Sequence, residues 1–468
     1  GGGRRGADRL FPAVRAFDAI VIGAGQAGPA LAGRLTAAGQ AVALIERKHL
    51  GGTCVNTGCM PTKALVASAK AAQVARRAAD YGVVLAGPVG VDMPAVRARA
   101  HKVTIDARGG LQSWIDGMKG CELIRGQARF TGPHEIEVNG ETLTAPRIFI
   151  NVGGRAAVPD MPGVREVATL NNTSILELDT LPRHLVVVGG SYIGLEFAQM
   201  YRRFGAQVTV VEKGPRLVSR EDPEVSDAIR AILEGEGITV RTGATCIGFK
   251  PHADGVEVGV DCTSGDPSVL GSHALLAVGR RPNTDDLGLE DAGVATDARG
   301  YIQVDDQLRT SAEGVWALGD CNGKGAFTHT SWNDYEIVAA NLLDDDPRRV
   351  SDRIDTYALY IDPPLGRCGM TETAARAAGH KVRVGKRPMS RVGRAVEKGE
   401  SQGFMKVVID ADTDAILGAA ILGVEGDEAI HTILDTMAAR QPYTTLQRTM
   451  HIHPTVSELI PTVLGELM

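Results

Sequence analysis

The sequence lacks several features that would assign it to particular classes of protein. No run of about eighteen apolar residues occurs, so no membrane-spanning helix is expected. The net charge is −6 at pH 7 and no long basic run is present, which argues against a nucleic-acid partner. Cysteine is sparse, with 7 residues among 468, so the chain does not resemble a secreted disulfide scaffold and is expected to be cytoplasmic.

The length exceeds what one hydrophobic core normally supports, so about two to four domains are expected. Residues 1–16 begin with a polar, glycine- and arginine-rich stretch, and we interpret them as a tail. No metal ligands are assigned anywhere in the chain.

The most informative stretch is residues 51–63, Gly-Gly-Thr-Cys-Val-Asn-Thr-Gly-Cys-Met-Pro-Thr-Lys. If one helix begins near Cys54, the sulfurs of Cys54 and Cys59 lie about one turn apart on one face. That spacing permits a small disulfide if the Cβ geometry is suitable, and a thiolate at a helix N-terminus is a competent nucleophile. The alternative is a pair of buried structural cysteines.

A dinucleotide-binding fingerprint precedes this stretch. Residues 18–22 read as a buried strand, followed by a glycine turn, a helix, and a second strand over residues 41–45. Glycines at this turn let the backbone approach a pyrophosphate, and an acid after the second strand binds ribose hydroxyls. The fingerprint positions are Gly23, Gly25, Gly28 and Glu46. The alternative is a glycine-rich turn that merely packs a helix against a sheet.

The same unit returns later in the chain at a constant offset. Residues 184–188 form the predicted strand, and Gly189, Gly194 and Glu212 repeat the positions of Gly23, Gly28 and Glu46. Two such units predict two bound nucleotides with electrons passing between them. Glu212 would repel a 2′-phosphate, so NADH is preferred and NADPH is the alternative. Arg216 and Arg220 could shift that preference, or could be ordinary solvated charges.

Several shorter motifs complete the pattern. Gly153 and Gly279 lie in glycine turns that we interpret as crossings between domains, and Asp320 ends a predicted strand where it would suit a cofactor hydroxyl. Near the end of the chain, Glu458 follows His453 by five positions, a spacing at which a carboxylate can orient an imidazole. A structural histidine is the alternative.

Taken in order, these motifs resemble the flavoprotein disulfide reductases, the class I pyridine nucleotide-disulfide oxidoreductases that include dihydrolipoamide dehydrogenase, glutathione reductase and mercuric reductase. The resemblance implies an α/β fold with two Rossmann-like dinucleotide-binding domains, for FAD and NAD(P), and an α+β C-terminal dimerisation domain. The implied limits are a tail at 1–16, an FAD-binding domain at 17–154 and 281–348, an NAD(P)-binding domain at 155–280 and a dimerisation domain at 349–468.

The resemblance also implies roles for individual residues. Cys59 would face the flavin as the charge-transfer thiolate, and Cys54 would be the interchange thiol that attacks the substrate. Lys63 would lie beside flavin N5, paired with Glu196. His453, oriented by Glu458, would come from the other subunit of a homodimer. The implied FAD-binding residues are Gly23, Gly25, Gly28, Glu46, Gly52, Thr53, Lys63, Gly153, Asp320, Thr328 and His329. The implied NAD-binding residues are Gly189, Tyr192, Gly194, Glu212 and Gly279, with Tyr192 covering the nicotinamide pocket.

Within the family, the sequence is most similar to a bacterial branch that is mercuric reductase-like and includes the reactive-chlorine-resistance flavoproteins that reduce Cu(II). Mercuric reductases carry a cysteine pair near the C-terminus, whereas here no cysteine follows Cys368, which argues against true Hg(II) reduction. We therefore expect an FAD-dependent NADH oxidoreductase whose acceptor is a small disulfide or a metal ion of the Cu(II) or Hg(II) kind. One alternative is the dihydrolipoamide dehydrogenase component of a 2-oxoacid dehydrogenase complex. Another is a slowly reacting redox sensor.

Overall fold

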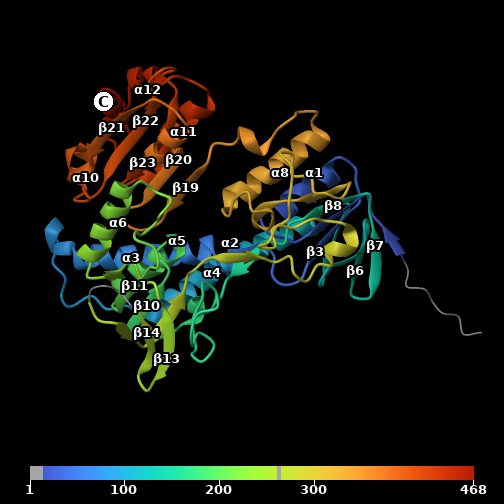
Figure 1. Ribbon diagram of the computed structural model, residues 1–468, viewed down its shortest axis with the longest axis horizontal. Coiled ribbons are helices and arrows are strands. Elements are labelled where there is room, and N and C mark those ends of the chain that lie inside the picture. The colour runs from blue at the N-terminus through green and yellow to red at the C-terminus, as the bar shows by residue number, and fades with distance from the viewer. Residues whose placement is uncertain (1–13, 261–264) are drawn as a thin grey trace, which may run out of the picture. The chain divides into compact units, whose positions relative to one another are not determined.

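The computed structural model describes residues 14–260 and 265–468 (Figure 1). Contacts divide the chain into two units. The first contains the described part of Gly1–Pro61 together with Ala100–Ala157 and Arg280–Arg353. The second contains Thr62–Arg99, Val158–Gly279 and Ile354–Met468. The domain limits expected from the sequence stay predictions.

The centre of the first unit is a five-stranded parallel sheet in the order β18-β8-β2-β3-β4. Its side chains alternate between two packed faces, as a strand period of two requires. Ala19 and Val21 pack with helices α1 (Ala27–Ala37) and α8 (Thr328–Leu343). The strands are β2 (Ala19–Ile22), β3 (Val42–Glu46), β4 (Cys121–Arg125), β8 (Arg147–Ile150) and β18 (Val315–Ala317).

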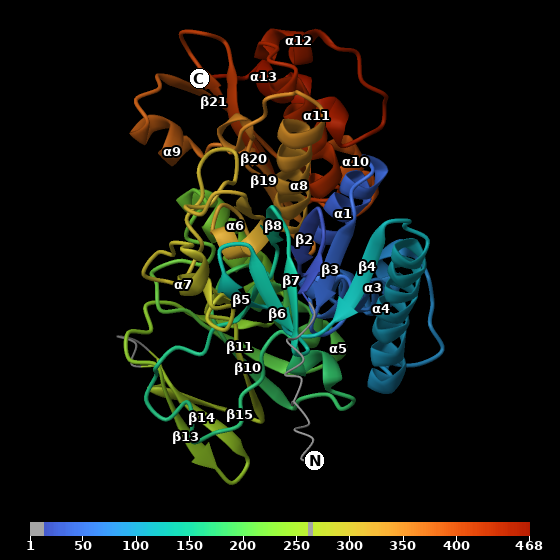
Figure 2. The ribbon, with the colours of Figure 1, turned by 90° about the vertical axis from the view of Figure 1, so that its right-hand side faces the viewer.

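The opposite face of that sheet packs on a smaller sheet in the order β1-β7-β6-β5, visible in Figure 2. Its strands are β1 (Val14–Ala16), β5 (Arg129–Gly132), β6 (Glu135–Val138) and β7 (Glu141–Thr144). Residues 14–16 were predicted as tail, but they pair in parallel with β7, because Thr142 to Thr144 offer an open strand edge. The rest of the predicted tail, residues 1–13, lies outside the described residues.

The second unit contains the repeated fingerprint in a four-stranded parallel sheet, ordered β12-β11-β10-β16. Valines of β10 and β11 pack against an antiparallel sheet of β13, β14 and β15, and helix α5 (Tyr192–Phe204) packs against β10 and β11. The strands are β10 (His184–Val188), β11 (Gln207–Val211), β12 (Thr239–Arg241), β13 (Gly248–His252), β14 (Gly255–Gly259), β15 (Ser268–Gly271) and β16 (His273–Leu276).

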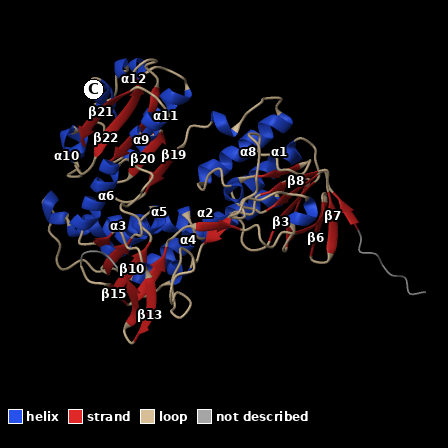
Figure 3. Cartoon of the chain, in the orientation of Figure 1, coloured by secondary structure: helices blue, strands red, loops and turns tan. Residues whose placement is uncertain are grey.

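The C-terminal part of the same unit is a five-stranded antiparallel sheet, ordered β19-β20-β23-β22-β21 (Figure 3). Helix α11 (Gly426–Ala438) packs on β20 and β23 around a core that includes Ile421 and Ile433. The strands are β19 (Thr356–Leu359), β20 (Leu365–Gly369), β21 (Val382–Pro388), β22 (Phe404–Asp410) and β23 (Ile416–Leu422). Antiparallel strands with helices on the sheet confirm the predicted α+β region, and the two parallel sheets confirm the α/β class.

The remaining elements connect these sheets. Strands β9 (Gly154–Ala156) and β17 (Arg280–Pro282) pair with each other. The other helices are α2 (Gly52–Asn56), α3 (Cys59–Arg76), α4 (Met93–Asp116), α6 (Pro223–Gly235), α7 (Leu289–Ala292), α9 (Glu372–Ala377), α10 (Gly393–Glu397), α12 (Tyr443–Arg448) and α13 (Ile460–Leu464). Across residues 14–260 and 265–468, no helix combines the length and apolar content that a bilayer span requires.

Candidate active site

The two cysteines of the central motif lie on different helices. Cys54 belongs to α2, which ends at Asn56, and Cys59 begins α3. The condition under which the two sulfurs would lie about one turn apart on the face of one helix is therefore not met. The chain breaks at Thr57 and Gly58, and only glycine fits at position 58 in this path, since a Cβ there would lie 2.8 Å from the Thr53 carbonyl oxygen. The break leaves Cys59 at a helix N-terminus, where exposed N–H groups stabilise a thiolate.

The cysteine segment lies directly against the first glycine turn. A Cβ at Gly52 would lie 2.8 Å from the Gly25 Cα, and Gly52 has a φ of +61°. The short contact and the left-handed backbone both exclude a side chain at Gly52. The Asn56 side-chain amide donates to the carbonyls of Leu50 at 2.9 Å and Gly52 at 2.8 Å, which fixes the entry into α2. Within the first unit, the predicted redox pair and the predicted FAD turn are thus neighbours.

Cys59 also lies close to two other predicted FAD residues. Its Sγ is 3.3 Å from the Thr328 Oγ1, and Thr328 is the first residue of α8. His329 follows, with its ring stacked on Phe327 at 5.3 Å. Burial raises the pKa of Asp320; the Cys59 charge adds to this shift and Arg280 opposes it. The first unit therefore brings Cys59, Thr328 and Asp320 together, while the Cys54–Cys59 disulfide stays a prediction.

The two fingerprints have the same backbone geometry. Gly23 (φ +104°) and Gly189 (φ +117°) follow the first strands, and a Cβ on either would lie 2.1 Å from a carbonyl oxygen of a neighbouring strand end. A Cβ at Gly28 or Gly194 would lie 2.1 Å from the carbonyl oxygen of Gly23 or Gly189 respectively. In both turns the helix packs so closely on the strand end that only glycine fits, which is the approach a pyrophosphate site requires.

The acids of the two fingerprints are held in the same way. Glu46 accepts hydrogen bonds from the amides of Ala24 at 2.9 Å and Lys48 at 2.7 Å. Glu212 accepts from the amides of Gly190 at 2.7 Å and Gly214 at 2.6 Å. Each carboxylate is fixed beside its glycine turn and keeps lone pairs for ribose hydroxyls.

The two glycines at the predicted domain crossings have a left-handed backbone with free space beside it. Gly153 and Gly279 have φ values of +67° and +117°, and a Cβ on either would meet nothing within 4 Å. The left-handed backbone, rather than crowding, favours glycine at these two positions. Together with the two glycine turns and their acids, this geometry fits two dinucleotides.

Lys63 and Glu196 form an ion pair inside the second unit. The Lys63 Nζ lies 2.9 Å from a Glu196 carboxylate oxygen, and the side chains are 34% and 6% exposed. The other Glu196 oxygen accepts from the Tyr360 amide at 2.9 Å, and the Lys63 ammonium lies 4.8 Å from the centre of the Tyr360 ring. The pair that the sequence predicted is therefore formed, and Tyr360 is a neighbour that no local pattern indicated.

The predicted His–Glu pair is also formed. The His453 Nδ1 lies 2.9 Å and 3.1 Å from the two carboxylate oxygens of Glu458. The His453 side chain is 79% exposed, whereas Glu458 is 15% exposed. Met450 and Ile452 beside it are 95% and 78% exposed. The imidazole is thus oriented by its own chain and accessible at a partly apolar surface.

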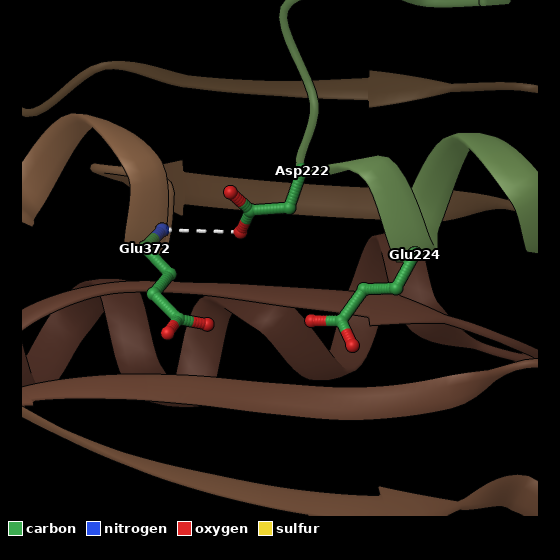
Figure 4. Close-up of side chains that lie close together, drawn as sticks. All are labelled: Asp222, Glu224 and Glu372. Atoms are coloured by element: carbon green, nitrogen blue, oxygen red, sulfur yellow. Dashed lines mark hydrogen bonds between the residues drawn. The ribbon is translucent and has the colours of Figure 1, made fainter.

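Three carboxylates gather between α6, α9 and β22: Asp222, Glu224 and Glu372 (Figure 4). The buried Lys406 ammonium lies 3.0 Å from Asp222 and 2.7 Å from Glu372, and also forms an ion pair with Glu224. Lys386 also pairs with Glu224, and Arg376 with Glu372. Three cations thus face the three acids, so the cluster is an internal ion network and we assign it no metal.

Arg367 and Glu221 form another buried ion pair, which the sequence did not predict. Arg367 Nε donates to both Glu221 carboxylate oxygens at 3.1 Å, and each residue is 2% exposed. The adjacent acids Glu221 and Asp222 are visible in the sequence after Arg220. No local pattern indicates that Glu221 pairs with an arginine of β20, far along the chain.

The chain is similar to known proteins over most of its length. The sequence profile of the pyridine nucleotide-disulphide oxidoreductases matches residues 17–334, and the profile of their dimerisation domain matches residues 356–464. A dihydrolipoyl dehydrogenase from Thermus scotoductus is 36% identical over 449 residues, covering 95% of this chain and 96% of the relative.

Two further relatives carry other names. The probable pyridine nucleotide-disulfide oxidoreductase RclA of Escherichia coli is 35% identical over 451 residues, covering 94% of this chain and 97% of the relative. A mercuric reductase from Bacillus cereus is 32% identical over 441 residues, covering 92% and 70%. The solved Cu(II) complex of the HOCl-induced flavoprotein disulfide reductase RclA superposes with a TM-score of 0.86 at 34% identity, covering 96% and 99%.

Proposed function

This chain belongs to the pyridine nucleotide-disulphide oxidoreductase family, and from that premise we propose that it reduces a small disulfide or an oxidising metal ion such as Cu(II). NADH is the proposed reductant and Cys54–Cys59 the proposed redox pair. The family uses FAD and NAD(P)H, so the chain is an FAD-dependent oxidoreductase. When bound, FAD accepts electrons from the nicotinamide and delivers them to a disulfide.

The observation that carries the proposal is the position of the cysteine segment against the first glycine turn, with Gly52 beside Gly25 and Cys59 beside Thr328. A cysteine pair in that place is next to the predicted flavin site. The proposed FAD ligands are Gly23, Gly25, Gly28, Glu46, Gly52, Thr53, Lys63, Gly153, Asp320, Thr328 and His329. The proposed NAD ligands are Gly189, Tyr192, Gly194, Glu212 and Gly279. The placement of Lys63 and Glu196 beside the flavin stays a prediction.

With a disulfide acceptor, the thiolate of Cys54 attacks one acceptor sulfur and releases the other as a thiol. Cys59 then attacks the Cys54 sulfur, which releases the second thiol and re-forms the Cys54–Cys59 disulfide. With Cu(II), the same two electrons reduce two ions to Cu(I), the state that soft thiolates favour. The RclA structure, described as a Cu(II) complex, supports the metal-ion acceptor.

His453 would hold and return the proton of the interchange thiol. Glu458 binds the Nδ1 side of the ring at 2.9 Å, which leaves Nε2 for the proton. The exposure of His453 and the match to the family's dimerisation domain support a homodimer in which this imidazole serves the partner subunit.

Anaerobic titration with NADH tests the redox pair. The two-electron-reduced enzyme is expected to show a long-wavelength thiolate–flavin absorption band that Cys59→Ser abolishes and Cys54→Ser retains. Free-thiol counts before and after reduction should rise by two in the wild type and by none in either variant. A reduced wild type without the band, indistinguishable from Cys59→Ser, would exclude the scheme.

Dihydrolipoamide dehydrogenase is the second candidate function, because the His453–Glu458 contact and the relative from Thermus scotoductus both favour it. Parallel assays with dihydrolipoamide and NAD, and with NADH and Cu(II), oxidised glutathione or Hg(II), separate the candidates. Rapid dihydrolipoamide oxidation that depends on Cys54 would favour the second function. Rapid NADH-dependent Cu(II) or disulfide reduction, with only background dihydrolipoamide oxidation, would favour the first.

A further inference from the structure

Tyr192, the proposed cover of the nicotinamide pocket, packs against a tyrosine of the C-terminal sheet. Tyr192 is the first residue of α5, and Tyr357 lies in β19. The ring centroids are 5.3 Å apart at an interplanar angle of 74°, the edge-to-face arrangement that aromatic pairs favour. The side chain that faces the nucleotide is therefore fixed from a part of the second unit outside the parallel sheet.

Tyr357 is itself held by a buried ion pair. Its hydroxyl donates a hydrogen bond to Glu221, which lies just before α6. The guanidinium of Arg367, in β20, donates to both oxygens of the same carboxylate at 3.1 Å through Nε, and again through Nη2. Glu221 and Arg367 are each 2% exposed, so no water competes for these bonds. A charged, multidentate contact of this kind fixes the orientation of both partners.

The protonation state of Tyr357 suits this role. Burial and the neighbouring negative charge of Glu221 raise the pKa of Tyr357, so the phenol stays neutral and remains a donor at physiological pH. Burial also raises the pKa of Tyr192. The Tyr192–Tyr357 contact is thus a contact between two neutral rings, with one ring anchored by charge.

We propose that Tyr357, anchored by Glu221 and Arg367, is a positioning residue that holds Tyr192 at the nicotinamide pocket and sets the affinity for the nicotinamide nucleotide. The inference rests on the proposed placement of Tyr192. An ordered pocket side chain costs less entropy on binding than a mobile one. Releasing Tyr192 should therefore weaken nucleotide binding while leaving electron transfer from bound NADH largely unchanged.

The test compares Tyr357→Leu with Tyr357→Phe in the FAD-loaded enzyme. Calorimetric titration with NAD gives Kd, and rapid mixing with NADH gives the limiting rate of flavin reduction. Tyr357→Leu should raise Kd by about two- to tenfold, with a limiting rate within about twofold of wild type. Tyr357→Phe keeps the ring contact but loses the hydrogen bond to Glu221, so its Kd should lie between those of wild type and Tyr357→Leu. An unchanged or lowered Kd in Tyr357→Leu would overturn the inference.

Two further variants separate this inference from the proposed function. Tyr443→Leu removes a partly buried tyrosine that accepts a hydrogen bond from Arg383 at 3.2 Å, and it controls for a general loss of packing. Tyr192→Ala should raise Kd by itself, and adding Tyr357→Leu should then change nothing further, because the two residues act as one unit. No effect of Tyr192→Ala would refute its placement at the pocket. An effect of Tyr192→Ala that Tyr357→Leu does not share, or full additivity, would refute this inference alone.

Discussion

At the scale of single residues, Gly58 determines where Cys59 lies. The residue occupies the break between α2 and α3, and a Cβ there would lie 2.8 Å from the Thr53 carbonyl oxygen and 3.2 Å from its Cγ2. The Thr57 amide donates to the same carbonyl at 2.9 Å, so the Thr53 oxygen cannot move away without breaking a hydrogen bond. A side chain at position 58 must instead displace the start of α3 and the sulfur that it carries.

Gly58→Ala is therefore expected to lower the free energy of unfolding by about 1–3 kcal/mol, as overpacking does. It should also slow re-formation of the Cys54–Cys59 disulfide, because the two sulfurs no longer meet at the required distance. Denaturant unfolding and the rate of free-thiol loss after reduction measure the two effects.

The matched control is Gly109→Ala, the same substitution at an exposed position of α4 where a Cβ would meet nothing within 4 Å. It should be neutral or stabilising by up to about 1 kcal/mol, because alanine favours helix over glycine. Equal behaviour of the two variants would show that crowding at Gly58 has no effect.

At the scale of elements, the two fingerprints offer a paired experiment on one chain. Gly28→Ala and Gly194→Ala each place a Cβ 2.1 Å from the carbonyl oxygen of the preceding glycine turn. Gly28→Ala should lower the flavin-to-protein ratio of the purified enzyme by more than about tenfold, since the turn opens where the pyrophosphate binds. Gly194→Ala should retain flavin and weaken NADH binding by a similar factor. Loss of flavin in Gly194→Ala, with retention in Gly28→Ala, would reverse the proposed assignment of the sites.

Elements that depend on local sequence were predictable, and contacts between distant elements were not. The apolar runs that became β2, β3, β10 and β11 are bounded by glycine turns, so their type and approximate limits follow from the sequence alone. The break at Gly58 was not predicted, because the close approach of Gly58 to the Thr53 carbonyl exists only in the folded chain. The networks of Lys406 and Arg367 were missed for a related reason: their acids lie far away in the sequence, around the start of α6.

The Lys406 network gives the junction of α6 with the C-terminal sheet a specific pH dependence. Burial alone would raise the pKa of Asp222, but hydrogen bonds from Thr373 and Lys406 outweigh it and lower the pKa to about 2. A carboxyl with a depressed folded-state pKa stabilises the fold above its unfolded value and loses that contribution as the pH falls toward the folded value. The lowered pKa of Asp222 corresponds to a contribution of about 2 kcal/mol to the free energy of unfolding at neutral pH. This contribution is lost between about pH 4 and pH 2.

Asp222→Asn should therefore be less stable than wild type by about 2 kcal/mol at pH 6, with the difference shrinking as the pH falls below about 4. Chemical unfolding across this pH range measures the difference. Asp227→Asn, at an exposed position of the same helix, should show no such trend. A constant difference between wild type and Asp222→Asn at all pH values would contradict the assigned charge network.

At the scale of the whole molecule, the proposed homodimer places His453 in the site of a second copy of the chain. The imidazole is oriented by Glu458 but is 79% exposed, beside Met450 and Ile452, whose apolar side chains are almost uncovered. An oriented acid–base group on an uncovered, partly apolar surface has the features of one half of a shared site. The C-terminal match to the family's dimerisation domain gives the same indication.

Mixing two inactive variants tests whether each site takes Cys54 from one subunit and His453 from the other. Cys54→Ser and His453→Ala homodimers should each be nearly inactive. After subunit exchange, a mixed dimer has one site with both residues intact, so an equal mixture should recover about a quarter of wild-type sites. If His453 served the cysteine of its own chain, neither site of a mixed dimer would be complete and the mixture would stay inactive.

The double variant Cys54→Ser/His453→Ala, exchanged with wild type, is the control, since its mixed dimers contain no complete site in the shared arrangement. Recovery that increases with the extent of exchange, in the first mixture and not in the control, would establish that two chains build each site.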